Sequence, residues 1–193
     1  MIITKDTFLA DVKDHKMEIV CDNQSIRLLK FRNPNTNCFW FEILTWPGSL
    51  CITGDCGSFV FRRSPDMFNF FRGDNINLQY WAEKLEADDK TDGHEAYSTE
   101  IFRTRILEWA HEYLNNVDDG ADENQHAILL KDVEETVLTD IGDKNMDMQR
   151  AIDFEHNNTY IFYDFREVDC MDFTPRFIWC CYAIQWAISQ YDS

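Results

Sequence analysis

The apolar residues before position 64 fall into short runs that are rich in β-branched and aromatic side chains. The runs read MEIVC, SIRLLKF, CFWFEILTW, LCIT and SFVFRR. The turn-forming segments NPNTN (33–37), PGS (47–49) and GDCG (54–57) lie between the last four of them. Because each connection is short, consecutive strands are expected to pair as antiparallel hairpins. The first third of the chain therefore predicts an antiparallel β-meander of four or five strands.

The alternation within residues 38–46 predicts which face of this sheet is buried. Phe39, Phe41 and Ile43 point to one side and make that side wholly apolar, whereas the residues between them give a mixed side. We expect helices to cover the wholly apolar side.

From residue 64 onward the apolar positions follow a helical period. Ser64 and Pro65 have the pattern of an N-cap and a first helical residue, so a short helix is expected after them. Ser98 is expected to cap a long helix. Thr174 and Pro175 begin a last helix that is apolar almost all round and is therefore predicted to be buried. The remaining predicted elements are an amphipathic helix at 76–89 with Ile76, Tyr80, Trp81 and Leu85 near one face, helices at 125–141 and 148–156, and a late strand at 159–165 that joins the sheet edge.

Together these elements predict the α+β class, with an N-terminal antiparallel β-meander packed against several C-terminal helices. The length of 193 residues suits one domain. No repeat, low-complexity segment or long linker divides the sequence. We therefore predict a single domain over 1–193, with 1–63 mainly β and 64–193 mainly helical and acidic.

The acidic residues are unevenly distributed along the chain, which has a net charge of −17. Residues 1–63 hold eight Lys/Arg and seven Asp/Glu, a net charge of +1. Residues 64–193 hold ten Lys/Arg and twenty-eight Asp/Glu, a net charge of −18. Such an excess repels nucleic acid and anionic membranes and favours a basic protein partner.

Residues 83–172 are the most acidic part, with twenty-five Asp/Glu and eight Lys/Arg. Single acidic runs of this kind commonly serve solubility, but the summed excess favours binding to a basic surface. A helix would align Asp140, Asp143 and Asp147 on one face, because they are three and four residues apart. The predicted partner-binding residues are Asp88, Asp89, Asp92, Glu95, Asp118, Asp119, Asp122, Glu123, Asp140, Asp143 and Asp147.

The segment GDCG at 54–57 raises the question of catalysis. Cys56 could be a nucleophile with Asp55 orienting a base, but a reactive thiolate needs a histidine or cation nearby, and no histidine is near in sequence. Glycines at both ends suit a tight hairpin turn instead. We therefore interpret the segment as a turn.

The seven cysteines form no motif with structural zinc spacing. Cys38, Cys51 and Cys56 could begin a zinc site across the hairpin, and buried free thiols are the simpler interpretation. The odd count, and an N-terminus without the apolar run of a signal peptide, indicate reduced thiols in the cytoplasm. The longest apolar-rich stretch, FIWCCYAIQWAI, has 12 residues and is too short to span a bilayer.

Other catalytic patterns are incomplete. The phosphate-binding patterns G-x-x-x-x-G-K-[ST] and G-x-G-x-x-G and the G-x-S-x-G elbow are absent, so no cofactor and no catalytic residue are predicted. The raw material for a metal-dependent hydrolase exists, because clustered carboxylates with histidine can bind divalent ions. The candidates for that alternative are His94, His111, His156, Asp164, Glu167, Asp169 and Asp172.

The run WPGSLCITGDCGSFVFRRSPDMFNFFR resembles a pattern of small cytoplasmic proteins encoded by tailed bacteriophages and prophages. The positions that match the pattern are Trp46, Pro47, Gly48, Gly54, Asp55, Gly57, Phe59, Phe61, Pro65, Asp66, Met67 and Phe68. The resemblance extends over about residues 26–110 and leaves the acidic C-terminal part outside. It implies a phage or prophage origin and a setting in the bacterial cytoplasm, and it implies no activity.

Three functions follow in order of preference. The first is a non-enzymatic protein that binds a basic surface of a host nucleic-acid-handling or defence protein and inhibits it, as a nucleic-acid charge mimic. Exposed aromatic residues such as Trp40 or Tyr97 would anchor that contact. The second is a virion or assembly component that forms oligomers, for which an exposed apolar sheet face would be the sign. The third is the metal-dependent hydrolase, and the oligomeric state is left open.

Overall fold

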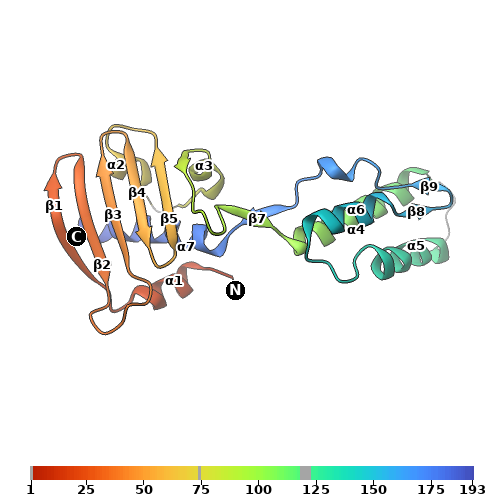
Figure 1. The fold of residues 1–193 in the computed structure, drawn as a ribbon, viewed down its shortest axis with the longest axis horizontal. Coiled ribbons are helices and arrows are strands. Elements are labelled where there is room, and N and C mark those ends of the chain that lie inside the picture. Colours follow the sequence, from red (N-terminus) through yellow and green to blue (C-terminus); the bar gives the residue numbers. More distant parts are fainter. Residues whose placement is uncertain (1, 74, 118–122) are drawn as a thin grey trace. The chain divides into compact units, whose positions relative to one another are not determined.

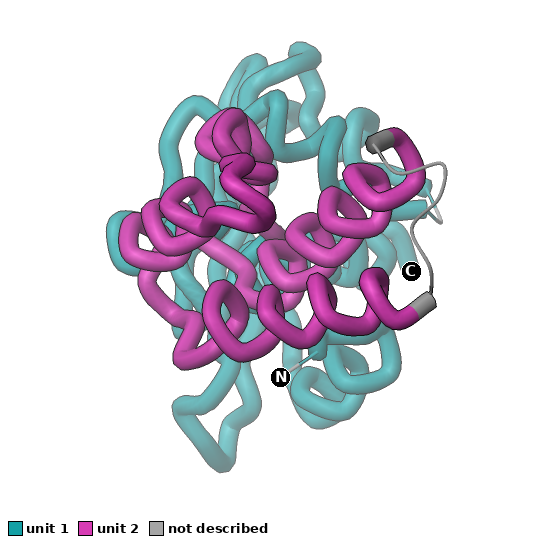
Figure 2. The backbone as a smooth tube through the Cα atoms, turned by 90° about the vertical axis from the view of Figure 1, so that its right-hand side faces the viewer, with its two compact units in different colours: residues 1–96, 173–193 teal, residues 97–172 magenta. Residues whose placement is uncertain are grey.

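The computed structural model describes residues 2–73, 75–117 and 123–193. It confirms the α+β class: a six-stranded antiparallel sheet is followed by several helices and short strands (Figure 1). The chain divides into two compact units (Figure 2). Unit 1 comprises residues 1–96 and 173–193, and unit 2 comprises residues 97–172. These limits differ from the predicted change of character at residue 63, and the single domain stays a prediction.

The strands are β1 (Lys16–Asn23), β2 (Ile26–Arg32), β3 (Phe41–Trp46), β4 (Ser49–Gly54), β5 (Gly57–Arg62), β6 (Leu85–Ala87), β7 (Glu95–Tyr97), β8 (Glu155–His156), β9 (Thr159–Tyr160) and β10 (Met171–Phe173). The helices are α1 (Lys5–Val12), α2 (Met67–Phe71), α3 (Leu78–Ala82), α4 (Thr99–Val117), α5 (Glu123–Thr136), α6 (Lys144–Ile152) and α7 (Pro175–Tyr191), with a 3-10 turn η1 (Phe165–Glu167). The strands β7 and β10 form a two-stranded sheet of their own.

The main sheet has the order β1-β2-β3-β4-β5-β6 with antiparallel neighbours, so the predicted meander is confirmed. The sixth strand was not predicted, because residues 76–89 have a helical apolar pattern. Only α3 is helical there, and Leu85 pairs with Phe61 instead. The backbone N–H of Arg62 also donates to the carbonyl of Lys84 at 2.8 Å. Pairing with the open edge of β5 therefore outweighs local helix propensity.

The start of α2 differs from the prediction by two residues. Asp66, not Ser64, is the N-cap, and its carboxylate accepts from the backbone N–H of Phe68 at 3.0 Å. The Ser64 hydroxyl donates to the carbonyl of Asp66 at 2.8 Å and so belongs to the turn before the helix. Both residues are good N-caps, and Asp66 has an additional partner in Arg27.

The helix α7 covers the inner face of the main sheet. Its N-terminal half contacts β5, where the rings of Phe177 and Phe59 lie 5.3 Å apart. Its last turn reaches β1, where the Tyr191 hydroxyl donates to the carboxylate of Asp22 at 2.8 Å. Figure 1 shows α7 behind β1 to β5, running across the strand direction. The predicted start is confirmed, because the Thr174 hydroxyl caps α7 with proline next in sequence.

The wholly apolar side of the third strand is buried against these helices, as predicted. Phe41 and Ile43 are fully buried, and Phe41 contacts Trp179 of α7 with ring centroids 5.6 Å apart. Phe39 lies in the loop before β3 with φ of 60° and still stacks on Trp179. The unpredicted helix α1 adds Phe8 to the same core.

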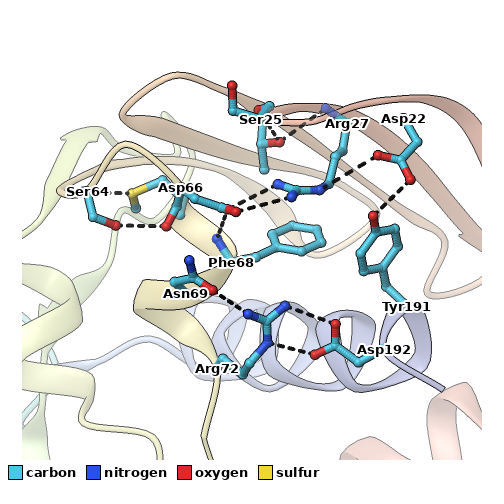
Figure 3. A network of polar contacts seen from close by, with 12 residues as sticks. Asp22, Ser25, Arg27, Ser64, Asp66, Phe68, Asn69, Arg72, Tyr191 and Asp192 are labelled. Atoms are coloured by element: carbon cyan, nitrogen blue, oxygen red, sulfur yellow. Dashed lines mark hydrogen bonds and ion pairs between the residues drawn. The ribbon is translucent and has the colours of Figure 1, made fainter.

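Arg27 of β2 is a buried cation that joins distant parts of unit 1 (Figure 3). Two of its guanidinium nitrogens donate to the carboxylate of Asp66 at 3.0 and 3.1 Å. The guanidinium also lies over the rings of Phe68 and Tyr191, at 4.6 and 5.6 Å. Bidentate pairing and ring stacking together fix β2 against α2 and the end of α7.

Unit 2 has a separate core formed by α4, α5, α6 and the segment after β9. The predicted N-cap of α4 is confirmed by a hydrogen bond from the N–H of Ile101 to the Ser98 hydroxyl at 3.3 Å. The core includes Phe102, Ile106, Leu129, Val133, Val137, Phe162 and Phe165.

The predicted late strand at 159–165 is wrong in length and in its pairing. Only Thr159 and Tyr160 are in a strand, and this strand, β9, pairs with β8 of its own unit. Asn157 and Asn158 have positive φ values and form the tight turn between β8 and β9. After Tyr160, the side chains of Ile161, Phe162 and Phe165 turn inward into the core of unit 2.

Candidate functional site

The segment at 54–57 is a hairpin tip, as predicted. Gly54 pairs with Gly57 across the turn. The Asp55 carboxylate accepts from the N–H of Phe39 at 2.8 Å, and the N–H of Asp55 donates to the carbonyl of Trp40 at 3.0 Å. A side chain at Gly54 would collide with that same carbonyl, so the close approach of two backbones requires glycine.

The surroundings of Cys56 do not activate its thiol as a nucleophile. Burial, and next the nearby Asp55 carboxylate, raise the pKa of the Cys56 thiol to about 12. The thiol is therefore protonated at neutral pH, whereas a nucleophilic cysteine needs a lowered pKa. The Cys180 thiol of α7 donates to the carbonyl of Cys56 at 3.6 Å, which ties the tip to the core.

Within residues 2–73, 75–117 and 123–193, no group of three or more His, Cys, Asp or Glu side chains lies close enough to hold a metal ion. Cys38 is exposed, and Cys51 and Cys56 are half-buried. The described residues therefore supply no ligand set for the zinc site or for the metal-dependent hydrolase.

The first predicted acidic group lies in the loop after β6. The Asp88 carboxylate accepts from the backbone N–H and the ring Nδ1 of His94, at 3.1 and 2.6 Å. The Asp89 carboxylate accepts from the N–H of Ser58 at 3.1 Å and from that of Thr91 at 2.9 Å. The Asp89 carboxylate therefore ties the loop to the start of β5, and the Asp88 carboxylate ties the loop to His94.

The same loop faces a cation from α7. Arg176 lies 3.5 Å from the Asp92 carboxylate and 3.8 Å from that of Asp89. Glu95 lies 4.0 Å from the ring of His94. The structure thus brings Asp88, Asp89, Asp92 and Glu95 together, and the Asp92 side chain, at 52% exposure, is the most accessible of them.

The second predicted acidic group is Asp118, Asp119, Asp122 and Glu123. Asp118, Asp119 and Asp122 lie outside the described residues. Glu123 is the first residue of α5.

The third predicted group does not share a helical face, because α6 begins only at Lys144. Asp140 lies before the helix with φ of 51°, and Asp143 is the N-cap. The Asp143 carboxylate accepts from the N–H groups of Asn145 and Met146, both at 3.0 Å. Aspartate favours an N-cap over a helix interior, since its carboxylate satisfies free N–H groups there.

Asp147 is the buried member of that group, with 0% exposure. Its carboxylate accepts from the Tyr97 hydroxyl at 2.9 Å and from the N–H of Gly142 at 2.8 Å, and Arg150 lies 3.8 Å away. Burial, followed by the bond to Asp147, raises the pKa of Tyr97. The Tyr97 hydroxyl is therefore engaged in the interior of unit 2. Trp40, the other predicted anchor, is 38% exposed.

The two units differ strongly in charge. Unit 2 contains nineteen acidic and six basic residues in its 76 residues, a net charge of −13. Unit 1 contains sixteen acidic and twelve basic residues, a net charge of −4. Unit 2 therefore has thirteen more carboxylate side chains than Lys and Arg side chains. The ion pairs within unit 2 include Arg103–Glu134, Arg105–Glu108, Lys131–Glu135 and Arg150–Asp147.

Exposed tyrosines accompany the acidic residues of unit 2. Tyr160 and Tyr163 are 54% and 66% exposed, and the exposed Glu155 and Glu167 lie in the same stretch of chain. The prediction of one strand over 159–165 did not identify these tyrosines as exposed. The sequence pattern is consistent with their exposure, because Tyr160 and Tyr163 flank the apolar pair Ile161 and Phe162.

Among the described residues, no helix is both long and apolar enough to cross a membrane. No family model, no curated protein and no solved structure that was compared with the chain matches it.

Proposed function

We propose that the chain is a non-enzymatic binding protein that docks on a basic surface of a host nucleic-acid-handling or defence protein and inhibits it. The observation that supports this proposal is the net charge of −13 concentrated in unit 2. Duplex DNA carries one negative charge per about 1.7 Å of axis, and a protein with many exposed carboxylates can compete for the same Lys/Arg groove. The proposed host setting follows the resemblance to phage and prophage proteins.

The binding surface comprises the exposed carboxylates of unit 2 together with Tyr160 and Tyr163. Carboxylates steer a basic partner into contact, and tyrosines provide an apolar ring with a polar end at an interface. Asp88, Asp89 and Asp147 are left out, because they form hydrogen bonds inside their own units.

The test compares retention of partners on two charge-neutralised variants of the full chain. The unit 2 variant carries Glu112→Gln, Glu155→Gln and Glu167→Gln, all at exposed positions. The matched control carries Asp6→Asn, Asp14→Asn and Glu86→Gln, at exposed positions of unit 1. Each variant loses three negative charges, so only their location differs.

Each tagged protein is incubated with bacterial lysate and washed at increasing salt, and bound proteins are identified by mass spectrometry. We expect a basic nucleic-acid-binding protein that elutes at clearly lower salt from the unit 2 variant than from the control, because exposed charge pairs are screened by salt. A purified partner should also lose its nucleic-acid binding when the unaltered chain is added. Absence of a salt-eluted basic partner, or equal shifts for both variants, would overturn the proposal.

A further inference from the structure

The outer face of the main sheet, opposite α7, carries an apolar row that crosses all six strands. The strand register places one residue of each strand next to the following one, from Cys21 to Leu28, Leu44, Cys51, Val60 and Ala87. We call this set the outer row. Leu44, at its centre, is 40% exposed, and the nearby Ile26 and Trp46 are 45% and 38% exposed. Contiguous apolar exposure of this kind marks an interaction surface, whereas scattered single residues do not.

The charges around the outer row differ from those of the rest of the chain. The first five strands place four cations and two carboxylates on this face, and the exposed Glu86 lies at its β6 edge, so the net charge there is +1 in a chain of net charge −17. The six charged residues of the first five strands are Lys16, Lys30, Arg32 and Arg62 with Glu18 and Glu42.

These charges alternate along one line. Glu18 pairs in register with Lys30, and Lys30 with Glu42, whose side chains form an ion pair of 3.1 Å. A line of alternating sign is self-complementary when it is turned about a twofold axis, since Lys30 of one copy can then meet a carboxylate of the other.

We infer that the outer face is a self-association surface on which a second copy of this chain packs, outer row against outer row. Two copies that are both strongly acidic repel each other least where they meet through a face that is not acidic. The inner face of the sheet is covered by α7, which crosses it from β5 to β1. The inference concerns unit 1 and does not depend on the proposed function of unit 2.

The size of the face predicts a weak dimer. Six strands spaced by about 4.8 Å and about six residues long form a patch of roughly 24 by 20 Å. Two such patches bury about 960 Å² in total, below the roughly 1,200–2,000 Å² of stable complexes. Dimerisation should therefore depend on concentration.

The self-association inferred here and the partner binding proposed above should respond to salt in opposite ways. Added salt screens the repulsion between two acidic chains and leaves apolar contact intact, so self-association should strengthen. Binding of unit 2 to a basic partner should weaken under the same change.

The experiment is sedimentation equilibrium of the full chain in reducing buffer, over a range of concentrations at low and high salt. We expect the mass to rise from 22.9 kDa toward twice that value with concentration, and more steeply at high salt. Leu44→Lys should return the mass to that of a monomer, because it places a charge at the centre of the outer row. Ile128→Lys, at a 56% exposed position of α5, is the matched control and should leave the dimer unchanged.

Leu44→Thr introduces a β-branched residue, which suits a strand, and provides a second variant should lysine impair folding. It should weaken dimerisation at least severalfold with an unchanged circular dichroism spectrum. A chain that is monomeric at every concentration and salt overturns the inference. So does a dimer that Leu44→Thr leaves intact, a dimer that Ile128→Lys abolishes equally, or a dimer that weakens as salt rises.

Discussion

At the scale of single residues, the contacts that matter most join positions far apart in the sequence. Arg27 is an example: nothing in SIRLLKF shows that its alternating position points inward, because arginine on a strand is usually exposed. Its partner Asp66 lies 39 positions away and also caps α2. A sequence pattern can suggest the cap, but only the fold brings the cation to it.

Replacing Arg27 should destabilise unit 1 substantially. Arg27→Met keeps much of the side-chain volume and leaves Asp66 without its cation, which we expect to cost about 2–3 kcal/mol of unfolding free energy, since Asp66 is partly exposed and can regain some solvation. Urea denaturation measures the change. Arg32→Met removes an exposed ion pair with Glu18 and should cost less than about 0.5 kcal/mol. Equal losses for the two variants would contradict the role of Arg27.

The same pair gives a pH dependence. Although burial opposes it, the hydrogen bonds from Arg27 and the N–H of Phe68 lower the pKa of Asp66 below its ordinary 3.8. A carboxylate whose pKa is lower in the folded state stabilises the fold above its unfolded-state pKa, and this contribution is lost as the pH falls through the folded value. The stability advantage of the natural chain over Asp66→Asn should therefore be constant near neutrality and shrink below a pH of about 4. Urea titrations at several pH values test this, and an advantage that grows on acidification would refute it.

At the scale of elements, the sequence predicts structure best where one signal is strong and uncontested. Defined turns separate the second to fifth strands, and Thr174 with Pro175 marks the start of α7. The helix α1 escaped prediction because only Phe8 and Val12 of its eight residues are buried, although Thr4 and Thr7 form a capping box. The strand β6 escaped because its pairing with β5 is a tertiary contact that no local pattern records.

The acids at 140–147 provide a test at this scale. If they had one helical face in common, removing any of them would relieve similar repulsion. In the structure their roles differ, so Asp140→Asn should leave stability nearly unchanged, since asparagine also tolerates positive φ. Asp143→Ala should cost about 1 kcal/mol through the lost N-cap.

Asp147→Ala should cost the most of the three, about 2–3 kcal/mol, because the Tyr97 hydroxyl and the Gly142 N–H lose a buried acceptor. Urea denaturation at neutral pH ranks the three variants. A flat ranking, or stabilisation by all three, would favour a common acidic face.

At the scale of the whole molecule, the sequence located the acidic excess in the C-terminal two thirds but not its limits. Units that are formed from distant segments, as unit 1 is from 1–96 and 173–193, have no signature in local composition. The candidate site could likewise be predicted only in part from the sequence. Sequence counts found the acidic groups, whereas the separation of internal carboxylates, such as Asp89 and Asp147, from surface ones required the hydrogen bonds of the fold.

A net charge of −13 on 76 residues should also affect the stability of the chain itself. Carboxylates in such excess on one small unit repel each other, and this repulsion falls once the Debye length shortens to about 10 Å at 0.1 M salt. We expect the Tm measured by calorimetry to rise with sodium chloride.

The unit 2 variant with Glu112→Gln, Glu155→Gln and Glu167→Gln should have a higher Tm at low salt and a shallower rise with salt. The control with Asp6→Asn, Asp14→Asn and Glu86→Gln removes equal charge from a unit with a net charge of only −4, so its salt dependence should stay close to that of the natural chain. If both variants flatten the salt dependence equally, the repulsion is spread over the whole chain and unit 2 is not its centre. If only the unit 2 variant does so, the acidic surface destabilises its own fold, and that cost is one a basic partner would relieve on binding.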